Sequence, residues 1–338
     1  MSILPALHAI VAGQSLTDAE AEAAMAVILE GSSTPPQIAA FLTALRMKGE
    51  TPAELTGFAR AMRHFAHPFD TGLSPDEPLL DTCGTGGDGP STFNISTLAA
   101  FVVAAAGVRV AKHGNRSISS KCGSADVLEA LGIRIDLSPE EAARAIREVG
   151  IAFLFAPAYH AATRHVQPVR KELRMRTVFN LLGPLANPAG ATVQVVGTTS
   201  EPNAQLIAGA LAGLGLTRGF VVHGYDGLDE VTTTTETLAF EIRDGNVTRL
   251  TLSPEDFGLP RAHLADLTGG LALDNCEIAQ RILAGERGPR RDIVLANAAL
   301  SLLAAGKVED LSVGMQLAAH ALDSGAARDK VSQLARFT

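Results

Sequence analysis

The sequence predicts an α/β protein with a small all-helical N-terminal domain and a larger domain built on a mainly parallel central sheet flanked by helices. Three observations indicate this fold class. The first 66 residues carry only helical signals, a Pro-dense segment follows, and the remaining chain alternates short apolar runs with helical periods. Such alternation is typical of strand–helix–strand units in a parallel sheet. With 338 residues, the chain is long enough for two domains and a large core.

The N-terminal unit is marked by three helix starts. Thr17, Thr34 and Thr51 each begin a T-x-x-E or T-x-x-Q capping box, in which two side chains satisfy backbone N–H groups at the helix start. Pro35 and Pro52 occupy first helical positions, where the missing N–H group would have no helical partner. We therefore expect consecutive helices before residue 67.

The segment 67–78 is the expected linker. Its prolines lie too close together for either a helix or a central strand. We place the boundary near residue 72, which gives a helical domain at 1–72 and an α/β domain at 73–338. The stretch 159–180 contains a helical segment, and we expect this stretch to pack against the helical domain.

The larger domain is expected to alternate strands and helices. The apolar runs that we predict as strands are 79–83, 108–111, 151–155, 192–197 and 219–223. One intervening helix begins at a capping box headed by Ser138 and ends before Gly150. Asp244-Gly245 separates the runs 238–242 and 247–252 and is typical of a hairpin turn, so an antiparallel pair should be added to the sheet.

Composition excludes several classes of protein. The formal charge of −8 argues against nucleic acid as a partner, because affinity for a phosphate backbone needs clustered Lys and Arg. The three cysteines form no C-x-x-C pair, which indicates a reducing compartment and no structural zinc site. Neither a secretory signal nor a membrane-spanning run is recognisable, so we expect a cytoplasmic protein with no membrane partner.

The stretch DTCGTGGDG at 81–89 contains the G-x-G-x-x-G pattern of dinucleotide-binding loops. That pattern predicts an acidic residue about 20 positions later, yet no Asp or Glu lies between Gly89 and Ala125. Four basic residues occupy this window instead. A glycine loop that opens a helix offers backbone N–H groups to an anion. The pattern therefore favours a diphosphate ligand over NAD, with a tight turn that binds nothing as the alternative.

Two further loops follow predicted strands, whose carboxyl ends meet at one edge of a parallel sheet. The run 112–121 offers lysines, an arginine, an asparagine and hydroxyls for phosphate and sugar oxygens. Asp229 and Glu230 suit Mg²⁺, because proteins hold this ion by one or two carboxylates plus substrate phosphates. Arg170, in a helical stretch, has the planar fork that suits a carboxylate. A solvated polar surface is the alternative in each case.

Four motifs in this order resemble those of the anthranilate phosphoribosyltransferase family. They are DTCGTGGDG with TFNIST, KHGNRSISSKCGSADVLEALG, PVRKELRMRTVFNLLGPLANP and HGYDGLDE. The resemblance spans nearly the whole chain. It implies a type II nucleoside-phosphorylase-like fold, with the active site between the two domains and a homodimer formed through the helical domain. It also implies transfer of the phosphoribosyl group of phosphoribosyl pyrophosphate (PRPP) to the amine of anthranilate in tryptophan biosynthesis.

The resemblance also implies roles for individual residues. Those expected to bind PRPP are Gly84, Gly87, Asp88, Thr92, Asn94, Ile95, Ser96, Thr97, Lys112, His113, Gly114, Asn115, Arg116, Ser117, Ile118, Ser119, Ser120 and Ser124. Those expected to meet anthranilate are Gly84, Asn115 and Arg170, the last through the carboxylate. Those expected to bind Mg²⁺, as a pair of ions per subunit, are Ser96, Asp229 and Glu230.

Two positions depart from the family pattern. Pro90-Ser91 stands where family loops often have a more flexible pair, and Arg174 replaces a residue that is commonly small. Neither position belongs to the expected ligand-binding set.

The expected chemistry needs no covalent nucleophile. Departure of pyrophosphate builds positive charge on the ribose and negative charge on the leaving group, so Mg²⁺ and the basic loops should act by stabilising that charge. An aromatic amine is already neutral near pH 7, so we assign no catalytic base. His113 is a candidate for orienting the amine or for accepting a proton late.

Two other functions are weighed against this one. A pyrimidine nucleoside phosphorylase shares the glycine loop but uses free phosphate, and the Asp229-Glu230 pair and Arg170 argue against it. A nucleic-acid-binding relative without enzymatic activity should have a basic surface, which the net charge of −8 contradicts.

Overall fold

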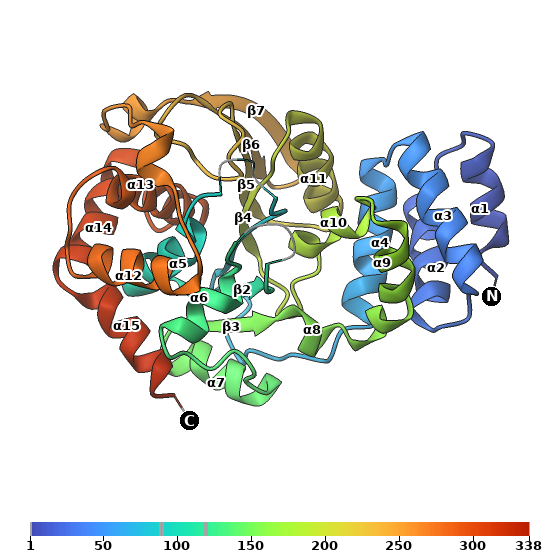
Figure 1. Cartoon of the computed structure of the whole chain (residues 1–338), viewed down its shortest axis with the longest axis horizontal. Helices are drawn as coiled ribbons and strands as arrows, with labels where there is room; N and C mark the ends of the chain where they lie inside the picture. Colours follow the sequence, from blue (N-terminus) through green and yellow to red (C-terminus); the bar gives the residue numbers. More distant parts are fainter. Residues whose placement is uncertain (1, 88, 90, 118–120, 338) are drawn as a thin grey trace.

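The computed structural model describes residues 2–87, 89, 91–117 and 121–337. Figure 1 shows the N-terminal helices as a bundle at one end of the molecule and the sheet with its helices at the other. This arrangement confirms the predicted fold class. None of the helices in the described ranges combines the length and apolar character that a membrane crossing requires.

The N-terminal bundle consists of α1 (Leu4–Val11), α2 (Asp18–Leu29), α3 (Pro35–Lys48) and α4 (Pro52–His64). The starts of α2 and α4 have the predicted capping boxes, and at α3 Thr34 N donates to Gln37 Oε1 (3.0 Å). At α4, Glu54 N donates to Thr51 Oγ1 (3.3 Å) and Thr51 N donates to Glu54 Oε2 (2.8 Å). The buried Glu54 also accepts from Leu16 N (3.0 Å) and from Lys48 Nζ (3.0 Å), so one carboxylate ties three segments of the bundle together.

Within the described ranges the sheet has seven strands, in the order β3-β2-β1-β4-β5-β6-β7. They are β1 (Leu79–Gly84), β2 (Arg109–Gly114), β3 (Ile151–Phe155), β4 (Val193–Gly197), β5 (Arg218–Gly224), β6 (Thr237–Arg243) and β7 (Asn246–Leu252). The first five run parallel, and β6 pairs antiparallel with both β5 and β7. Asp244 and Gly245 have φ of 50° and 78°, as the predicted hairpin turn requires.

The strand order places a topological switch point beside β1. The chain runs from β1 to β2 and β3 on one side, and then returns to β4 on the other side of β1. Loops that leave the carboxyl ends of β1 and β4 therefore diverge, and such crevices are where open α/β sheets bind ligands.

Helices and short 3₁₀ turns lie before, between and after the strands. The α-helices are α5 (Ile95–Ala105), α6 (Ser124–Ala130), α7 (Pro139–Glu148), α8 (Ala156–Tyr159), α9 (Gln167–Leu173), α10 (Phe179–Leu182), α11 (Glu201–Gly213), α12 (Ala272–Leu283), α13 (Pro289–Ala304), α14 (Leu311–Asp323) and α15 (Ala326–Ala335). The 3₁₀ turns are Ala161–His165, Gly183–Leu185, Pro254–Phe257 and Leu264–Leu267.

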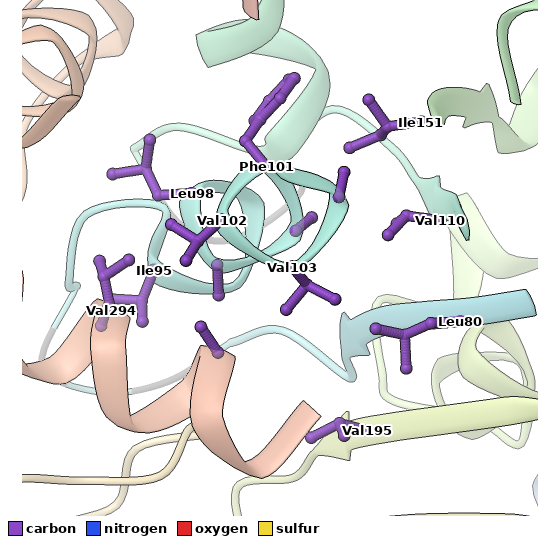
Figure 2. Packing of buried hydrophobic residues seen from close by; sticks show 14 of the residues in the cluster. Leu80, Ile95, Leu98, Phe101, Val102, Val103, Val110, Ile151, Val195 and Val294 are labelled. Atoms are coloured by element: carbon purple, nitrogen blue, oxygen red, sulfur yellow. The ribbon is translucent and has the colours of Figure 1, made fainter. Parts of the chain in front are cut away.

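The sheet separates two apolar cores. On one face, α5 packs over Leu80, Val110 and Val195, with α13 beside it (Figure 2). On the other face, Val196 and Val221 pack with α11 and with residues of the N-terminal helices. Because successive strand residues point to opposite faces, neighbouring valines such as Val195 and Val196 belong to different cores.

The stretch after β3 is broken into short pieces. Helix α8, the turn Ala161–His165 and α9 follow one another, and α9 ends at Arg174 with φ of 49° in the left-handed region. The expected helical stretch is thus discontinuous. Val166 and Val169 are buried in the same core as Ile38 of α3, so this stretch lies against the helical bundle.

Candidate active site

Three loops meet at one edge of the sheet, above the carboxyl ends of the parallel strands. The β1–α5 loop covers 85–94, the β2–α6 loop covers 115–123, and the β5–β6 loop covers 225–236. Hydrogen bonds join the first of these to the third, as the predicted convergence requires. Predicted residues Asp88, Ile118, Ser119 and Ser120 lie outside the described residues.

The glycine loop is held against Asp229. Gly86 N donates to Asp229 Oδ2 (3.0 Å), and Thr85 N donates to the carbonyl of Gly197 at the end of β4 (2.9 Å). A Cβ atom on Gly84 would lie 2.5 Å from Asp229 Oδ2, so this glycine lets the carboxylate approach the backbone. Gly86 and Gly87 have φ of 66° and 79°, which other residues rarely adopt.

The start of α5 is joined to the other predicted metal-binding carboxylate. Ser96 N donates to Glu230 Oε1 (3.1 Å), and Lys112 Nζ donates to Ser96 Oγ (3.4 Å) and to the Thr82 carbonyl. Ser96 therefore lies between a cation and an anion at a helix N-terminus, where N–H groups and the helix dipole favour negative ligands.

The remaining predicted residues of the glycine loop and α5 occupy different environments. The side chains of Ile95 and Thr97 are buried, and Ile95 N donates to the Phe93 carbonyl (2.8 Å). Thr92 forms an isolated β-bridge with Thr268. Asn94 accepts from Asn275 Nδ2 (3.0 Å) and donates to the Cys122 carbonyl (3.3 Å), which links the glycine loop to the β2–α6 loop.

A buried charge pair lies beneath the three loops. Asp81 is fully buried and Lys112 is 3% exposed. Burial raises the pKa of Asp81 and lowers that of Lys112. The positive charge of Lys112 partly offsets the rise in the Asp81 pKa, and the negative charge of Asp81 partly offsets the fall in the Lys112 pKa. Asp81 Oδ1 also accepts from His113 N (3.1 Å). The pair fixes the end of β2, from which the second loop departs.

The second loop directs its arginine toward α6. Arg116 forms ion pairs with Asp126 (2.9 Å) and Glu129 (2.6 Å), and Ser117 N donates to Asp126 Oδ2 (3.2 Å). Ser124 Oγ donates to the Asn115 carbonyl (3.3 Å). A Cβ atom on Gly114 would collide with Ser124 Oγ, so Gly114 allows the close contact between β2 and α6.

His113 is buried next to a second histidine. Its ring lies 5.2 Å from that of His160, and His113 Nδ1 is 3.2 Å from the Gly183 carbonyl. Burial lowers the pKa of His113 to about 3 and that of His160 to about 4. Both rings are therefore neutral near pH 7. A neutral His113 is compatible with orienting a substrate and cannot donate a proton as an imidazolium.

Arg170 projects from α9 over the Phe179 ring, with its guanidinium carbon 5.4 Å from the ring centroid. Burial lowers its pKa. No carboxylate within the described ranges pairs with this guanidinium. Nearby in sequence, Arg176 Nη2 donates to the Gly86 carbonyl (3.4 Å), which brings the chain after α9 to the glycine loop.

The carboxylates suit a metal that completes its coordination elsewhere. Across the part of the chain that the structure describes, no group of three or more His, Cys, Asp or Glu side chains could hold a metal ion. Asp229 and Glu230 instead reach two different backbone segments, at Gly86 and Ser96. Two carboxylates, with the Ser96 hydroxyl as the predicted third protein ligand, fit Mg²⁺, whose remaining ligands would be phosphate oxygens and water.

The cysteines near these loops are thiols. Burial raises the pKa of Cys83 well above its usual range and that of Cys122 to about 11. Nucleophilic attack requires a thiolate, so both residues serve packing and weak hydrogen bonding.

Sequence reasoning missed several polar residues around the site. Asp81 and Arg176 stand inside motifs that were recognised, but their partners could not be read from spacing. Asn275 and Asn297 come from the distant helices α12 and α13, and each bonds to a loop of the site. The signal for Asn297 was a single amide in the apolar run IVLANAALSLLA.

Comparisons with known proteins cover both domains. The model described as "Glycosyl transferase family, helical bundle domain" matches residues 4–66, and "Glycosyl transferase family, a/b domain" matches residues 76–328. The chain is 63% identical to the anthranilate phosphoribosyltransferase of Solibacter usitatus (strain Ellin6076) over 337 residues, which is 100% of this chain and 99% of that relative.

Solved structures agree with these matches. The crystal structure of anthranilate phosphoribosyltransferase from Thermus thermophilus is 46% identical, with a TM-score of 0.92 over 98% of each chain. The Saccharomyces cerevisiae enzyme in complex with PRPP and Mg is 27% identical, with a TM-score of 0.89 over 98% of this chain and 96% of that one. Its complex with 4-fluoroanthranilate gives 26% identity and a TM-score of 0.86 at the same coverage.

Proposed function

This chain belongs to the anthranilate phosphoribosyltransferase family and has that activity, and we propose that it transfers the phosphoribosyl group of PRPP to the anthranilate amine by Mg²⁺-assisted departure of pyrophosphate. The products are N-(5-phosphoribosyl)anthranilate and pyrophosphate, in the pathway of tryptophan biosynthesis. The observation that carries the proposal is that Asp229 and Glu230 hydrogen-bond directly to the glycine loop and to the start of α5.

The diphosphate of PRPP binds between these elements. Gly87, with φ of 79°, would let it approach the backbone, Gly84 makes room for the Asp229 carboxylate beside it, and Ser96 lies at the N-terminus of α5. Lys112 lies beneath the glycine loop and contributes positive charge. Its Nζ is held there by hydrogen bonds to Ser96 Oγ and the Thr82 carbonyl. Such a cradle favours an anion by N–H donors, a helix dipole and a buried cation acting together. A yeast relative bound to PRPP and Mg supports this choice of ligand.

Asp229, Glu230 and Ser96 would hold a pair of Mg²⁺ ions in each subunit. When bound, Mg²⁺ stabilises the charge that develops on the departing pyrophosphate. The chain's own groups do the rest: the glycine loop orients the diphosphate, and Lys112 supplies further charge stabilisation. Because these donors are fixed before the reaction, little reorganisation is needed in the oxocarbenium-like transition state.

Anthranilate binds on the side of Arg170, Asn115 and Gly84. The Arg170 guanidinium has no carboxylate partner among the described residues, so the carboxylate of anthranilate would supply one in the bidentate geometry that arginine favours. The complex of a relative with 4-fluoroanthranilate supports an acceptor of this class. The amine attacks C1 of the ribose as pyrophosphate leaves, and neutral His113 orients the amine or takes its proton late.

The working molecule is a cytoplasmic homodimer formed through the helical domain. Helices α1 and α3 expose apolar side chains, with Val11 69% exposed and Met47 83% exposed. A dimer formed through the helical domain would cover these side chains. Sedimentation of the chain at micromolar concentration checks the assembly, because a single monomeric species would contradict it.

Two assays test the function. The first supplies PRPP and anthranilate with and without Mg²⁺ and follows the loss of anthranilate fluorescence, to which a chain without Trp adds little background. The second supplies a pyrimidine nucleoside and phosphate. We expect turnover only in the first assay and only with Mg²⁺. Activity confined to the second would mean that the glycine loop serves phosphorolysis.

A further inference from the structure

A buried asparagine of α13 lies directly behind the acidic pair. Asn297 is 4% exposed and stands in the apolar helix α13. Its Oδ1 accepts from Val231 N (3.0 Å), and its Nδ2 donates to the Val231 carbonyl (2.9 Å) and to the Ile293 carbonyl (2.9 Å). One side chain thus binds both polar groups of a single backbone residue, as a neighbouring β-strand would.

Val231 directly follows Glu230 in the chain. The segment from Leu228 to Val231 lies outside the named helices and strands, so it has no helical or sheet ladder of its own to fix it. Gly224 N donates to the Leu228 carbonyl at one end (2.9 Å), and Asn297 holds Val231 at the other. The two carboxylates project from the short stretch between these two attachments.

The partners of the carboxylates explain why this attachment matters. Asp229 and Glu230 meet Gly86 N and Ser96 N, and the Asp229 carbonyl packs so closely on Gly197 that a Cβ atom there would overlap it. A shift of the segment would move both carboxylates away from the diphosphate cradle. Residues that orient metal ligands from behind typically change metal affinity by roughly 10- to 100-fold when removed.

We propose that Asn297 is a positioning residue for the metal-binding carboxylates, which it orients by clamping the backbone of Val231. The inference rests on the proposed function, because it takes Asp229 and Glu230 as the Mg²⁺ ligands. Asn297 itself touches neither substrate nor metal. Its removal should therefore weaken the Mg²⁺-dependent binding of PRPP and leave the anthranilate side intact.

The test uses the full chain with Asn297→Leu, which keeps the side-chain size and removes all three hydrogen bonds. PRPP binding is measured by calorimetry over a range of Mg²⁺ concentrations, without anthranilate and without turnover. We expect the Mg²⁺ concentration for half-maximal binding to rise roughly tenfold or more, while the KM for anthranilate stays within about twofold of wild type. Asn297→Asp retains the acceptor for Val231 N, and it should show a smaller shift in the same direction.

Ser301→Ala is the matched control. Ser301 lies one turn further along α13, is buried, and donates to the Asn297 carbonyl (2.7 Å) without reaching the loop. This variant should keep the wild-type Mg²⁺ dependence even if its thermal stability falls. An equal shift in Ser301→Ala, or an unchanged Mg²⁺ dependence in folded Asn297→Leu, would overturn the proposal. If the leucine variant does not fold, an unchanged Mg²⁺ dependence in Asn297→Asp overturns it.

Two further variants separate this inference from the function on which it rests. Asp229→Asn and Glu230→Gln should each weaken Mg²⁺-dependent PRPP binding. If neither does, the metal assignment fails and the role of Asn297 fails with it. If both do and Asn297→Leu does not, only the positioning role is wrong. The double variant Glu230→Gln with Asn297→Leu should weaken Mg²⁺-dependent PRPP binding by less than the sum of the two single effects, because both changes act on the same loop segment.

Discussion

Arg170 carries the sharpest prediction at the scale of single residues. Arg170→Ala should raise the KM for anthranilate by roughly 10- to 100-fold, because a charged hydrogen bond contributes about 1.5–3 kcal/mol to binding. The KM for PRPP should change little, since that substrate occupies the glycine loop. Steady-state fluorescence assays with each substrate varied in turn provide the measurement.

Two neighbouring variants sharpen that test. Arg170→Lys keeps the positive charge and loses the planar fork, so it should lie between wild type and Arg170→Ala. Lys171→Ala removes an exposed cation from the same helix and should behave as wild type. An unchanged anthranilate KM in Arg170→Ala would remove this residue from the acceptor site.

The two buried histidines predict how stability depends on pH. Burial lowers the pKa of His113 to about 3 and that of His160 to about 4, from an ordinary value of 6.5. Below pH 6.5 the unfolded chain takes up protons that the folded chain refuses, so stability falls as pH falls through this window. Each histidine should remove about 2 kcal/mol from the free energy of unfolding between pH 6.5 and pH 5.

Urea unfolding of wild type and His160→Gln at pH 7.5 and pH 5.0 measures the contribution of His160 to the pH dependence of the free energy of unfolding. The variant should show a difference between the two pH values that is smaller by about 2 kcal/mol than in wild type. His263→Gln, at an exposed histidine, serves as the control and should retain the wild-type difference. Equal pH dependence in wild type and His160→Gln would mean that His160 is protonated in the folded chain.

At the scale of elements, the end of β4 limits the position of the β5–β6 loop. A Cβ atom on Gly197 would overlap the Asp229 carbonyl, so Gly197→Ala must displace the acidic pair. We expect kcat/KM to fall roughly 100-fold, as small displacements of catalytic groups commonly do. Gly183→Ala is the control, because it has open space and helical φ and ψ, and it should keep its activity. Far-UV circular dichroism checks that both variants fold.

Local elements were predictable because their signals are local. The capping boxes at Thr17 and Thr51 and the turn at Asp244-Gly245 each act within a few residues, and all three formed as predicted. The end of α9 was not predictable in this way. Arg174 adopts a left-handed conformation that usually marks a glycine, so the sequence signal for the helix end is missing.

The candidate site was predictable only as far as it depends on the order of strands and loops. Glycines, carboxylates and basic residues after parallel strands indicated which loops form it. The pairing of Arg116 with Glu129 was not predictable, because Glu129 lies 13 residues away on α6 and the pair depends on how the loop meets that helix. Asn297 and Val231 lie 66 residues apart in sequence, so their contact depends on how α13 packs and leaves no local pattern.

At the scale of the whole molecule, the two domains share one apolar core. The second core cluster includes Phe41 and Phe58 of the helical bundle together with Leu211 of α11 and Val221 of the sheet. A polar bond crosses the same boundary, where Arg60 Nη2 donates to the Gly213 carbonyl (3.1 Å). Linker composition indicated a domain boundary near residue 72, but a shared core of this kind couples the unfolding of the two domains.

This coupling predicts a single unfolding transition for the whole chain. Far-UV circular dichroism in urea is the suitable measurement, because the chain has no Trp to report on either domain by fluorescence. Gly213 lies on α11, where a Cβ atom would be 2.6 Å from Thr56 Oγ1 of α4. Gly213→Val should therefore force α4 and α11 apart and lower the free energy of unfolding by about 1–3 kcal/mol.

The shape of the transition distinguishes coupled from independent domains. If the two domains are coupled, Gly213→Val shifts the single unfolding transition of the whole chain to a lower urea concentration. Gln205→Val places the same side chain on an exposed position of α11 and should leave the midpoint nearly unchanged. Two separate transitions, with the first reporting only α1 to α4, would mean that the apolar contact across α4 and α11 is too weak to hold the bundle against the sheet.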